Sequence, residues 1–198
     1  QPLGVFYLPH CKGLVKNENG SYFYDIEDLD HNGNVDLSDG GDRYIAGQAT
    51  PKVILGSNIS FRFKNYYVSI QMNGAFGHKI FNGTGLAYTS MACFPDYNVF
   101  KDAPKKNIID QRVSDYWLEK GDYLNFEHLT IGYNVPLRSK LIRSLRVSCN
   151  ISNIGTITGY KGLTPMINSY VVNSTMGIDD KRNYPLYRTY SLGLSVQF

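Results

Sequence analysis

Residues 53–64 read Val-Ile-Leu-Gly-Ser-Asn-Ile-Ser-Phe-Arg-Phe-Lys, and this stretch decides the fold. One parity carries Val53, Leu55, Ser57, Ile59, Phe61 and Phe63, whereas the other carries Gly56, Asn58, Ser60, Arg62 and Lys64. A period of two places alternate side chains on opposite faces of a β-strand. The pattern breaks at Asn65 and resumes over residues 66–76. The sequence therefore predicts a β-hairpin with one apolar and one polar face.

The same alternation recurs towards the C-terminus, over residues 129–135, 145–152 and 190–198. Pro136 ends the first of these runs, because proline has no backbone N–H to donate to a neighbouring strand. We therefore expect three further antiparallel strands. The only helix that the pattern suggests is a brief one over residues 113–120.

The connections between these strands are very unequal in length. Those at Asn65 and Pro136 are short, whereas residues 11–52, 77–121 and 155–184 form long segments rich in Gly, Asn, Asp, Ser and Tyr. Loops of that length are uncommon inside a compact domain. Alternately short and long connections between strands of about ten residues are typical of an outer-membrane β-barrel, with short periplasmic turns and long extracellular loops.

Composition excludes several other classes of protein. The chain has 198 residues, of which 42% are hydrophobic, 14% aromatic and 19% charged, so it is not disordered. The net charge is only +3 and the basic residues are scattered, which argues against nucleic-acid binding. Cys11, Cys93 and Cys149 have no metal-ligand spacing, and we expect three free thiols. A Cys11–Cys93 disulfide is the alternative.

No catalytic constellation stands out in the sequence. It contains no nucleophile elbow, no paired zinc histidines and no phosphate-binding loop. We therefore expect neither an enzyme nor an organic cofactor. The acidic pair Asp179-Asp180 falls in a predicted loop, where we expect solvated charges.

One local motif is specific. Residues 28–39 read Asp-Leu-Asp-His-Asn-Gly-Asn-Val-Asp-Leu-Ser-Asp and fit the calcium-loop pattern D-x-[DN]-x-[DN]-G. The expected metal ligands are Asp28, Asp30, Asn32, the backbone carbonyl of Asn34, Asp36 and Asp39. The flanking residues do not form amphipathic helices, so we predict a structural calcium ion that folds a long loop. The alternative is an Asx-rich loop whose carboxylates only cap local turns.

The long connections also carry aromatic side chains: Tyr88, Phe94, Tyr97, Tyr116 and Trp117. Three interpretations remain open for them. They stack on sugar rings or pack on a partner, they form small cores of the loops, or they belong to an interfacial aromatic girdle.

Several motifs together resemble a known family. They comprise Gln1–Tyr7; Asp28–Asp39 followed by Asp42-Arg43 and Gly47; Pro51-Lys52 with Gly56; Gly121–Leu124 through Thr130–Tyr133 to Pro136; Asn153 with Gly159-Tyr160 and Gly162; and Tyr184-Pro185, Arg188-Thr189, Gly193 and Phe198. In this order and spacing they resemble the C-terminal end of SusC/RagA-type TonB-dependent outer-membrane transporters of Bacteroidetes. Asn125, where the family usually has Arg, and Asn34, where Asp is more usual, depart from the pattern.

The resemblance implies an all-β fold of antiparallel transmembrane strands, about the last six of a 22-stranded barrel. Residues 1–198 would be the C-terminal part of that barrel, without its plug domain and earlier strands, and the chain would be a fragment, a cleaved product or one chain of a nicked barrel. The implied function is import of oligosaccharide or peptide nutrients across the bacterial outer membrane. The implied partners are the rest of the barrel and its plug, a SusD-like lipoprotein, TonB and outer-membrane lipid.

The resemblance also implies a topology. The turns at Asn65 and Pro136 would be periplasmic, whereas the segments 77–121 and 155–184 and the Asp28–Asp39 loop would be extracellular. Leu145, Val147, Cys149 and Ile151 would face lipid, and Arg146, Ser148 and Asn150 would face a polar lumen.

One alternative function belongs to another class. A soluble, calcium-stabilised β-sandwich that binds carbohydrate would also have alternating strands and aromatic side chains in its loops. Such a module would bury the apolar face of each sheet against a second sheet.

Overall fold

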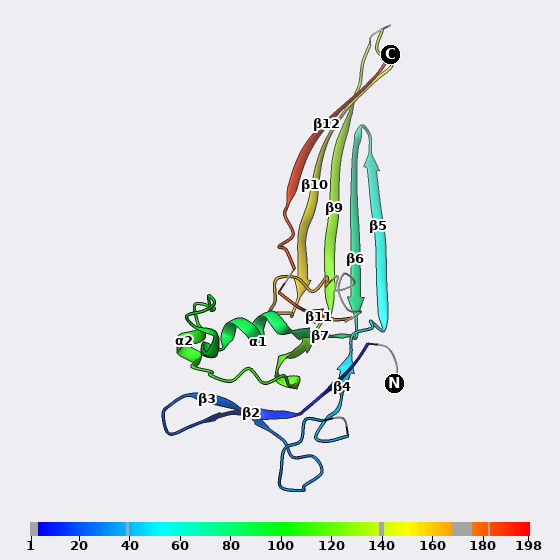
Figure 1. The fold of residues 1–198 in the computed structure, drawn as a ribbon. Helices are drawn as coiled ribbons and strands as arrows, with labels where there is room; N and C mark the ends of the chain where they lie inside the picture. The colour runs from blue at the N-terminus through cyan, green and yellow to red at the C-terminus, as the bar shows by residue number, and fades with distance from the viewer. Residues whose placement is uncertain (1–3, 39, 139–140, 168–175, 182) are drawn as a thin grey trace. The chain divides into compact units, whose positions relative to one another are not determined.

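The computed structural model describes residues 4–38, 40–138, 141–167, 176–181 and 183–198. Its elements are β1 (Val5–Leu8), β2 (Cys11–Lys16), β3 (Tyr22–Ile26), β4 (Tyr44–Gln48), β5 (Val53–Phe63), β6 (Tyr66–Phe76), β7 (Lys79–Asn82), α1 (Gly83–Thr89), η1 (Met91–Cys93), α2 (Ala103–Lys106), η2 (Asp115–Trp117), β8 (Leu118–Lys120), β9 (Tyr123–Val135), β10 (Ser144–Thr158), β11 (Ile178–Asp179) and β12 (Thr189–Gln197). They form two compact units (Figure 1). The first comprises residues 1–51, 77–121 and 160–184, and the second comprises residues 52–76, 122–159 and 185–198.

The second unit is one antiparallel sheet in the order β12-β10-β9-β6-β5, called here the long sheet. The predicted hairpin is confirmed, because β5 and β6 pair without a break from Val53↔Phe76 to Phe63↔Tyr66. Two residues connect these strands, and the first of them, Lys64, has a φ of 51°. The alternation of the sequence thus sets the register of the pair, since a slip by one residue would exchange the two faces.

The three C-terminal strands are confirmed, and β9 and β10 are longer than predicted. β9 has 13 residues and ends at Val135, immediately before Pro136. β10 has 15 residues and contains an irregularity between Ser152 and Gly155, where the period of two is lost. This bulge explains why the alternation alone ended the predicted strand near residue 152. Figure 1 shows both short connections at the same end of the long sheet, whereas the long connections leave from the other end.

The first unit contains the long connections, which are largely structured. It has two two-stranded sheets, β1-β4 and β2-β3, and a three-stranded sheet in the order β11-β7-β8. A small hydrophobic core joins these pieces; it consists of Phe6, Tyr24, Ile26, Ala49, Phe81, Ile108 and Trp117. Among the described residues, none of the helices is long and apolar enough to cross a membrane.

The helix predicted for residues 113–120 is wrong. Only the 3-10 turn η2 forms there, and residues 118–120 continue as β8. Two tertiary interactions override the local pattern. The Trp117 indole enters the core, where its Nε1 donates to the Tyr24 hydroxyl at 2.8 Å. The backbone after it pairs with β7, from Phe81↔Leu118 to Lys79↔Lys120.

Asp179 is also placed differently from the prediction. It is buried, not solvated, because β11 pairs in parallel with β7 and carries it inside the first unit. Its carboxylate accepts hydrogen bonds from Thr84 Oγ1 at 2.7 Å, Tyr160 Oη at 2.8 Å and Asn183 Nδ2 at 3.1 Å. Burial and this carboxylate both raise the pKa of Tyr160, so its hydroxyl remains a donor. A buried acidic side chain is tolerated here because several donors surround it.

The three cysteines are free thiols, as expected, and the alternative Cys11–Cys93 disulfide is not formed. The Cys11 thiol donates to the carbonyl of Gly13 at 3.1 Å. The Cys93 sulfur instead accepts from Gln111 Nε2.

Candidate functional site

The long sheet has one continuous apolar face. Its register aligns apolar side chains in rows that cross all five strands: Phe63–Tyr66–Tyr133–Val147–Leu194, Phe61–Val68–Ile131–Cys149–Leu192 and Ile59–Ile70–Leu129–Ile151–Tyr190. Many of these side chains are exposed, Phe61 by 65% and Leu192 by 86%. An apolar surface of this extent marks an interaction site or a membrane-facing surface. Among its described residues the second unit contains no second sheet to cover this face, as the β-sandwich alternative would require.

The opposite face of the long sheet is polar and joined by side-chain hydrogen bonds. Ser60 Oγ donates to Ser69 Oγ at 3.1 Å, and Ser69 Oγ donates to Asn58 Oδ1 at 3.0 Å. Two strands further along, Thr130 Oγ1 donates to Asn150 Oδ1 at 2.9 Å. Alternation between an apolar outer face and a polar inner face is the pattern of barrel strands that enclose water.

The acidic loop in the first unit folds around its own carboxylates. Asp28 Oδ2 accepts from the Gly33 N–H at 2.8 Å, and Asp30 Oδ1 accepts from the Asn32 N–H at 3.0 Å. His31 and Gly33 adopt positive φ angles of 58° and 88°, which makes the turn tight. The Gly33 hydrogen bond is the main reason why the pKa of Asp28 is lowered below its usual value. This carboxylate therefore carries its charge at neutral pH.

A carboxylate outside the predicted motif completes the group. Asp42 is fully buried, with 0% exposure. Its Oδ1 accepts from the N–H groups of Leu29 and Asp30, and its Oδ2 accepts from the Asp36 N–H at 2.7 Å. Ligand oxygens of Asp28, Asp30 and Asp42 lie within 4.8 Å of one another. The Asp42-Arg43 pair belonged to the quoted family motif, and that was the signal in the sequence that pointed to this residue.

The predicted ligands Asn32 and Asp36 form hydrogen bonds within the loop. Asp36 uses its two carboxylate oxygens to accept from the backbone N–H and the hydroxyl of Ser38, both at 2.8 Å. Asn32 donates its amide to Asp30 and accepts from the Asn34 N–H. Asp39 lies outside the described residues. Among the acidic side chains of the described residues, Asp28 and Asp30 are the predicted ligands whose oxygens meet, and they meet at Asp42.

The three carboxylates fit a divalent cation. Asp28 Oδ1 is buried and has no hydrogen-bond partner among the described residues, so one acceptor at the centre of the group is left unused. Calcium prefers six to eight oxygen ligands from carboxylates, carbonyls and water. The hydrogen bonds within the loop equally fit the alternative of capped local turns.

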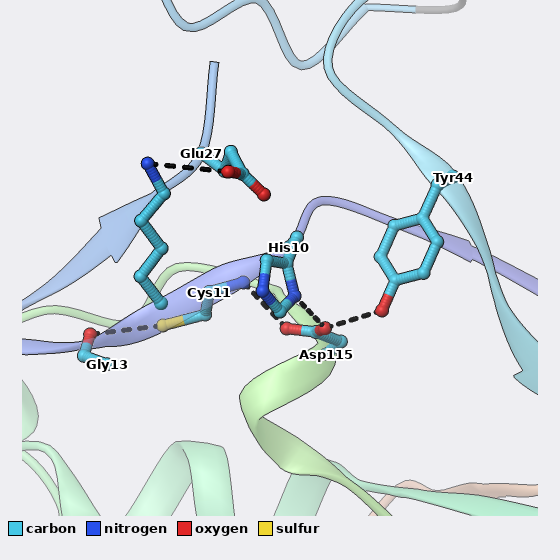
Figure 2. A network of polar contacts seen from close by, with 7 residues as sticks. His10, Cys11, Gly13, Glu27, Tyr44 and Asp115 are labelled. Atoms are coloured by element: carbon cyan, nitrogen blue, oxygen red, sulfur yellow. Dashed lines mark hydrogen bonds and ion pairs between the residues drawn. The ribbon is translucent and has the colours of Figure 1, made fainter. Parts of the chain in front are cut away.

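A second polar cluster joins distant segments of the first unit, as Figure 2 shows. Asp115 Oδ2 lies 2.7 Å from His10 Nδ1 and accepts from the Tyr44 hydroxyl at 2.7 Å. Its Oδ1 accepts from the Cys11 N–H at 2.7 Å. Burial by itself raises the pKa of Asp115, but these hydrogen bonds outweigh it, so the pKa lies below the usual value. Burial and Asp115 raise the pKa of Tyr44 to about 12.

The aromatic side chains of the long connections divide into two groups. Trp117 is buried in the core, and Tyr116 packs on it with ring centroids 5.2 Å apart. Tyr88 packs on Phe100 at 5.8 Å. Phe94 and Tyr97 are instead exposed. Tyr116 is itself 43% exposed. The interpretation as local cores therefore holds for Trp117 and Tyr88, whereas the other two interpretations remain open for Phe94, Tyr97 and Tyr116.

Sequence comparison finds relatives that cover the chain. It is 28% identical to TonB-dependent receptor P3 of Formosa agariphila over 230 aligned positions, which span 100% of this chain and 22% of that receptor. It is 26% identical to TonB-dependent receptor SusC of Bacteroides thetaiotaomicron, over 93% of this chain and 18% of SusC. The chain thus spans about a fifth of the length of these curated relatives, both named as receptors and not as enzymes. No protein-family model matches the chain.

Solved structures show the same fold. The RagAB peptide importer in its open-open state superposes with a TM-score of 0.70 at 18% identity, over 98% of this chain and 22% of that one. Another structure of the RagAB peptide transporter gives a TM-score of 0.67 at 16% identity, over 99% and 23%. The arrangement of antiparallel strands and long connections in this chain therefore matches that of a barrel segment in the RagAB transporter.

Proposed function

We propose that this chain, homologous along its length to TonB-dependent receptors that include SusC, forms part of the β-barrel wall of an outer-membrane nutrient transporter. The observation that carries the proposal is the pair of faces of the long sheet. Three apolar rows cross all five strands on one face, and hydrogen-bonded polar side chains occupy the other. The first face contacts lipid, and the second lines the polar interior.

The rest of the barrel and its plug domain complete the transporter. Energy for import comes through TonB, which acts on the plug and not on this chain. A SusD-like lipoprotein binds over the extracellular side of the transporter. The relative named TonB-dependent receptor SusC and the structural neighbour RagAB support this set of partners.

The substrate is an oligosaccharide or a peptide. The RagAB neighbours are peptide importers, which supports the second class. A strain without the gene distinguishes the two when its growth is compared on a panel of oligosaccharides and on a panel of peptides. Loss of growth on one panel alone identifies the class of substrate.

Fractionation tests the membrane assignment. An antibody against residues 187–198 is used to probe outer-membrane and soluble fractions, with and without heating. We expect a band much larger than 22 kDa in the outer membrane, whose mobility changes on heating because a folded barrel resists the detergent. A soluble band near 22 kDa would overturn the proposal.

We also propose that Asp28, Asp30 and Asp42 hold a structural calcium ion. The unused Asp28 oxygen and the mutual proximity of the three carboxylates support it. The ion would have a structural role. It would hold the three carboxylates together and so stabilise the turn of the loop.

Calorimetric titration of the purified transporter, stripped with EDTA, tests the calcium site. We expect calcium to bind and the double variant Asp28→Asn/Asp30→Asn to lose that binding. Magnesium is titrated in parallel, because it demands six ligands in a smaller octahedron and retains water more firmly. Equal heats for the wild type and the double variant would leave only the capped-turn interpretation.

A further inference from the structure

Charge is distributed unevenly between the two units. The segments that form the second unit contain eight Lys and Arg residues but only two acidic ones, Asp122 and Glu127. The remaining segments contain twelve basic and fifteen acidic residues. The nearly neutral chain is therefore a combination of a basic sheet and an acidic unit.

Within the long sheet, the basic residues gather at one end. We call it the short-turn end; it comprises residues 62–67, 132–138, 141–147 and 194–197. It carries Arg62, Lys64, Arg138, Arg143 and Arg146, and none of its residues is acidic. Asp122 and Glu127 lie at the opposite end, where β9 begins. Five basic side chains with no acidic side chain among the described residues of this end indicate an anionic partner.

Near this end the apolar face carries an aromatic row on β5, β6 and β9, and one more apolar row, Val135–Leu145–Val196, lies beyond it on β9, β10 and β12. Phe63, Tyr66 and Tyr133 are register neighbours, and the Tyr66 and Tyr133 ring centroids lie 4.7 Å apart. The Lys64 ammonium lies 5.4 Å from the centre of the Phe63 ring. An aromatic row capped by a cation is the arrangement found where a membrane-spanning surface meets the headgroups.

The β9–β10 connection also places an exposed apolar side chain between basic ones. Leu141 is 81% exposed, and Arg138 and Arg143 are exposed on either side of it. Arg143 has the parity of Leu145 and so belongs to the apolar side of the sheet. Arg62 and Arg146 have the other parity, and Arg146 contacts Tyr67 and Asn134 on the polar face.

We propose that the short-turn end binds the anionic headgroups of phospholipids through Lys64, Arg138 and Arg143. The proposal rests on the membrane position argued above, and it adds a lipid preference to it. Exposed apolar side chains between the cations enter the acyl region, while the cations reach the phosphate layer. Each basic group at an anionic surface contributes about fivefold to binding.

The test uses the complete transporter in lipid nanodiscs of phosphatidylethanolamine with and without phosphatidylglycerol. Native mass spectrometry measures how many lipids of each kind remain bound. We expect the wild type to retain phosphatidylglycerol preferentially, and the triple variant Lys64→Gln/Arg138→Gln/Arg143→Gln to lose that preference by at least tenfold. The matched control is Arg62→Gln, at the same end but on the polar face, which should retain the preference.

The outcomes separate this inference from the function on which it rests. A transporter that inserts normally but shows no preference for phosphatidylglycerol overturns the headgroup site alone. An equal loss in the Arg62→Gln control also overturns it, because overall charge would then be responsible. A protein that does not enter the outer membrane overturns the membrane position itself.

Discussion

Tyr67 crosses over Gly132 on the polar face of the long sheet, so closely that a Cβ built on Gly132 would lie 2.0 Å from Tyr67 Cε1. The two residues are direct neighbours in the β6–β9 register. The Arg146 guanidinium lies 5.3 Å from the centre of the Tyr67 ring, and its Nε donates to Asn134 at 2.9 Å. Because Gly132 has no side chain, the Tyr67 ring of β6 can lie over β9. The Arg146 guanidinium of β10 then packs on the same ring.

Replacement of Gly132 by alanine should destabilise the barrel. The added methyl group forces the Tyr67 ring out of its position, and overpacking of this kind costs about 1–3 kcal/mol. The measurement is the urea concentration at which the heat-modifiable band of the complete transporter is lost. We expect a lower midpoint for Gly132→Ala.

The matched control is Gly56→Ala on β5, because nothing lies within 4 Å of a Cβ built there. Its midpoint should equal that of the wild type. The double variant Gly132→Ala/Tyr67→Ala should recover part of the loss, since the space is then restored. An unchanged midpoint in Gly132→Ala would mean that the Tyr67 ring is not held over the glycine.

The strands of the long sheet were predictable because each has a polar face and an apolar face. In such a strand, polar and apolar residues alternate along the sequence. A single residue such as Pro136 is enough to end the strand. The bulge near Ser152 hid the rest of β10, since the alternation stops where the register shifts. The elements of the first unit were not predictable in this way, because strands of two to six residues are too short for a pattern.

The candidate site was predictable only in part. The spacing of Asp28 and Asp30 identifies the loop, because ligands two residues apart lie within one turn. Asp42 lies beyond the motif, and its role depends on burial against backbone N–H groups that no spacing rule describes. Asp179 was misjudged for the same reason, since a parallel pairing with a distant strand decides its burial.

Asp42→Asn should loosen the 28–42 loop even when calcium is saturating. The amide has only one acceptor oxygen, whereas the carboxylate accepts three N–H groups on two oxygens. Each hydrogen bond to a buried charged group contributes about 1.5–3 kcal/mol. Limited proteolysis of intact cells should therefore cleave within the loop faster in this variant.

Asp36→Asn serves as the comparison, because the hydrogen bonds of its exposed side chain to the described residues go to Ser38 in the same loop. Its cleavage rate should stay near that of the wild type. If the two variants were cleaved equally fast, Asp42 would not be the residue that organises the loop. The Asp28→Asn variant should respond to calcium removal less than the wild type does.

The Asp115 cluster should make the first unit sensitive to acid. The folded-state pKa of Asp115 is lowered, so its hydrogen bonds stabilise the fold above the ordinary pKa of about 3.9 and are lost as pH falls through the folded value. Protease resistance of residues 1–51 and 77–121 should drop when pH falls below about 4. In Asp115→Asn the resistance should be lower at pH 7 and should change less with pH.

Tyr44→Phe isolates one contribution to this effect. It removes the hydroxyl that donates to Asp115 and leaves His10 and Cys11 in place. The acid transition should therefore move to a higher pH without disappearing. A transition at the same pH in all three proteins would assign the acid sensitivity to other carboxylates.

Removal of residues 190–198 should abolish insertion into the outer membrane. β12 pairs with β10 through nine consecutive residues, from Thr189 to Gln197, and its Leu192 and Leu194 extend the apolar rows. Without it, β10 has an unpaired edge at membrane depth, where every unsatisfied backbone group costs several kcal/mol. The truncated protein should therefore be absent from the outer membrane and should show no heat-modifiable band.

The control Ser191→Ala changes only the polar face of the same strand and should insert normally. Insertion of the truncated protein at the wild-type level would mean that β12 is not part of the barrel wall, and the membrane assignment of the whole sheet would fail with it.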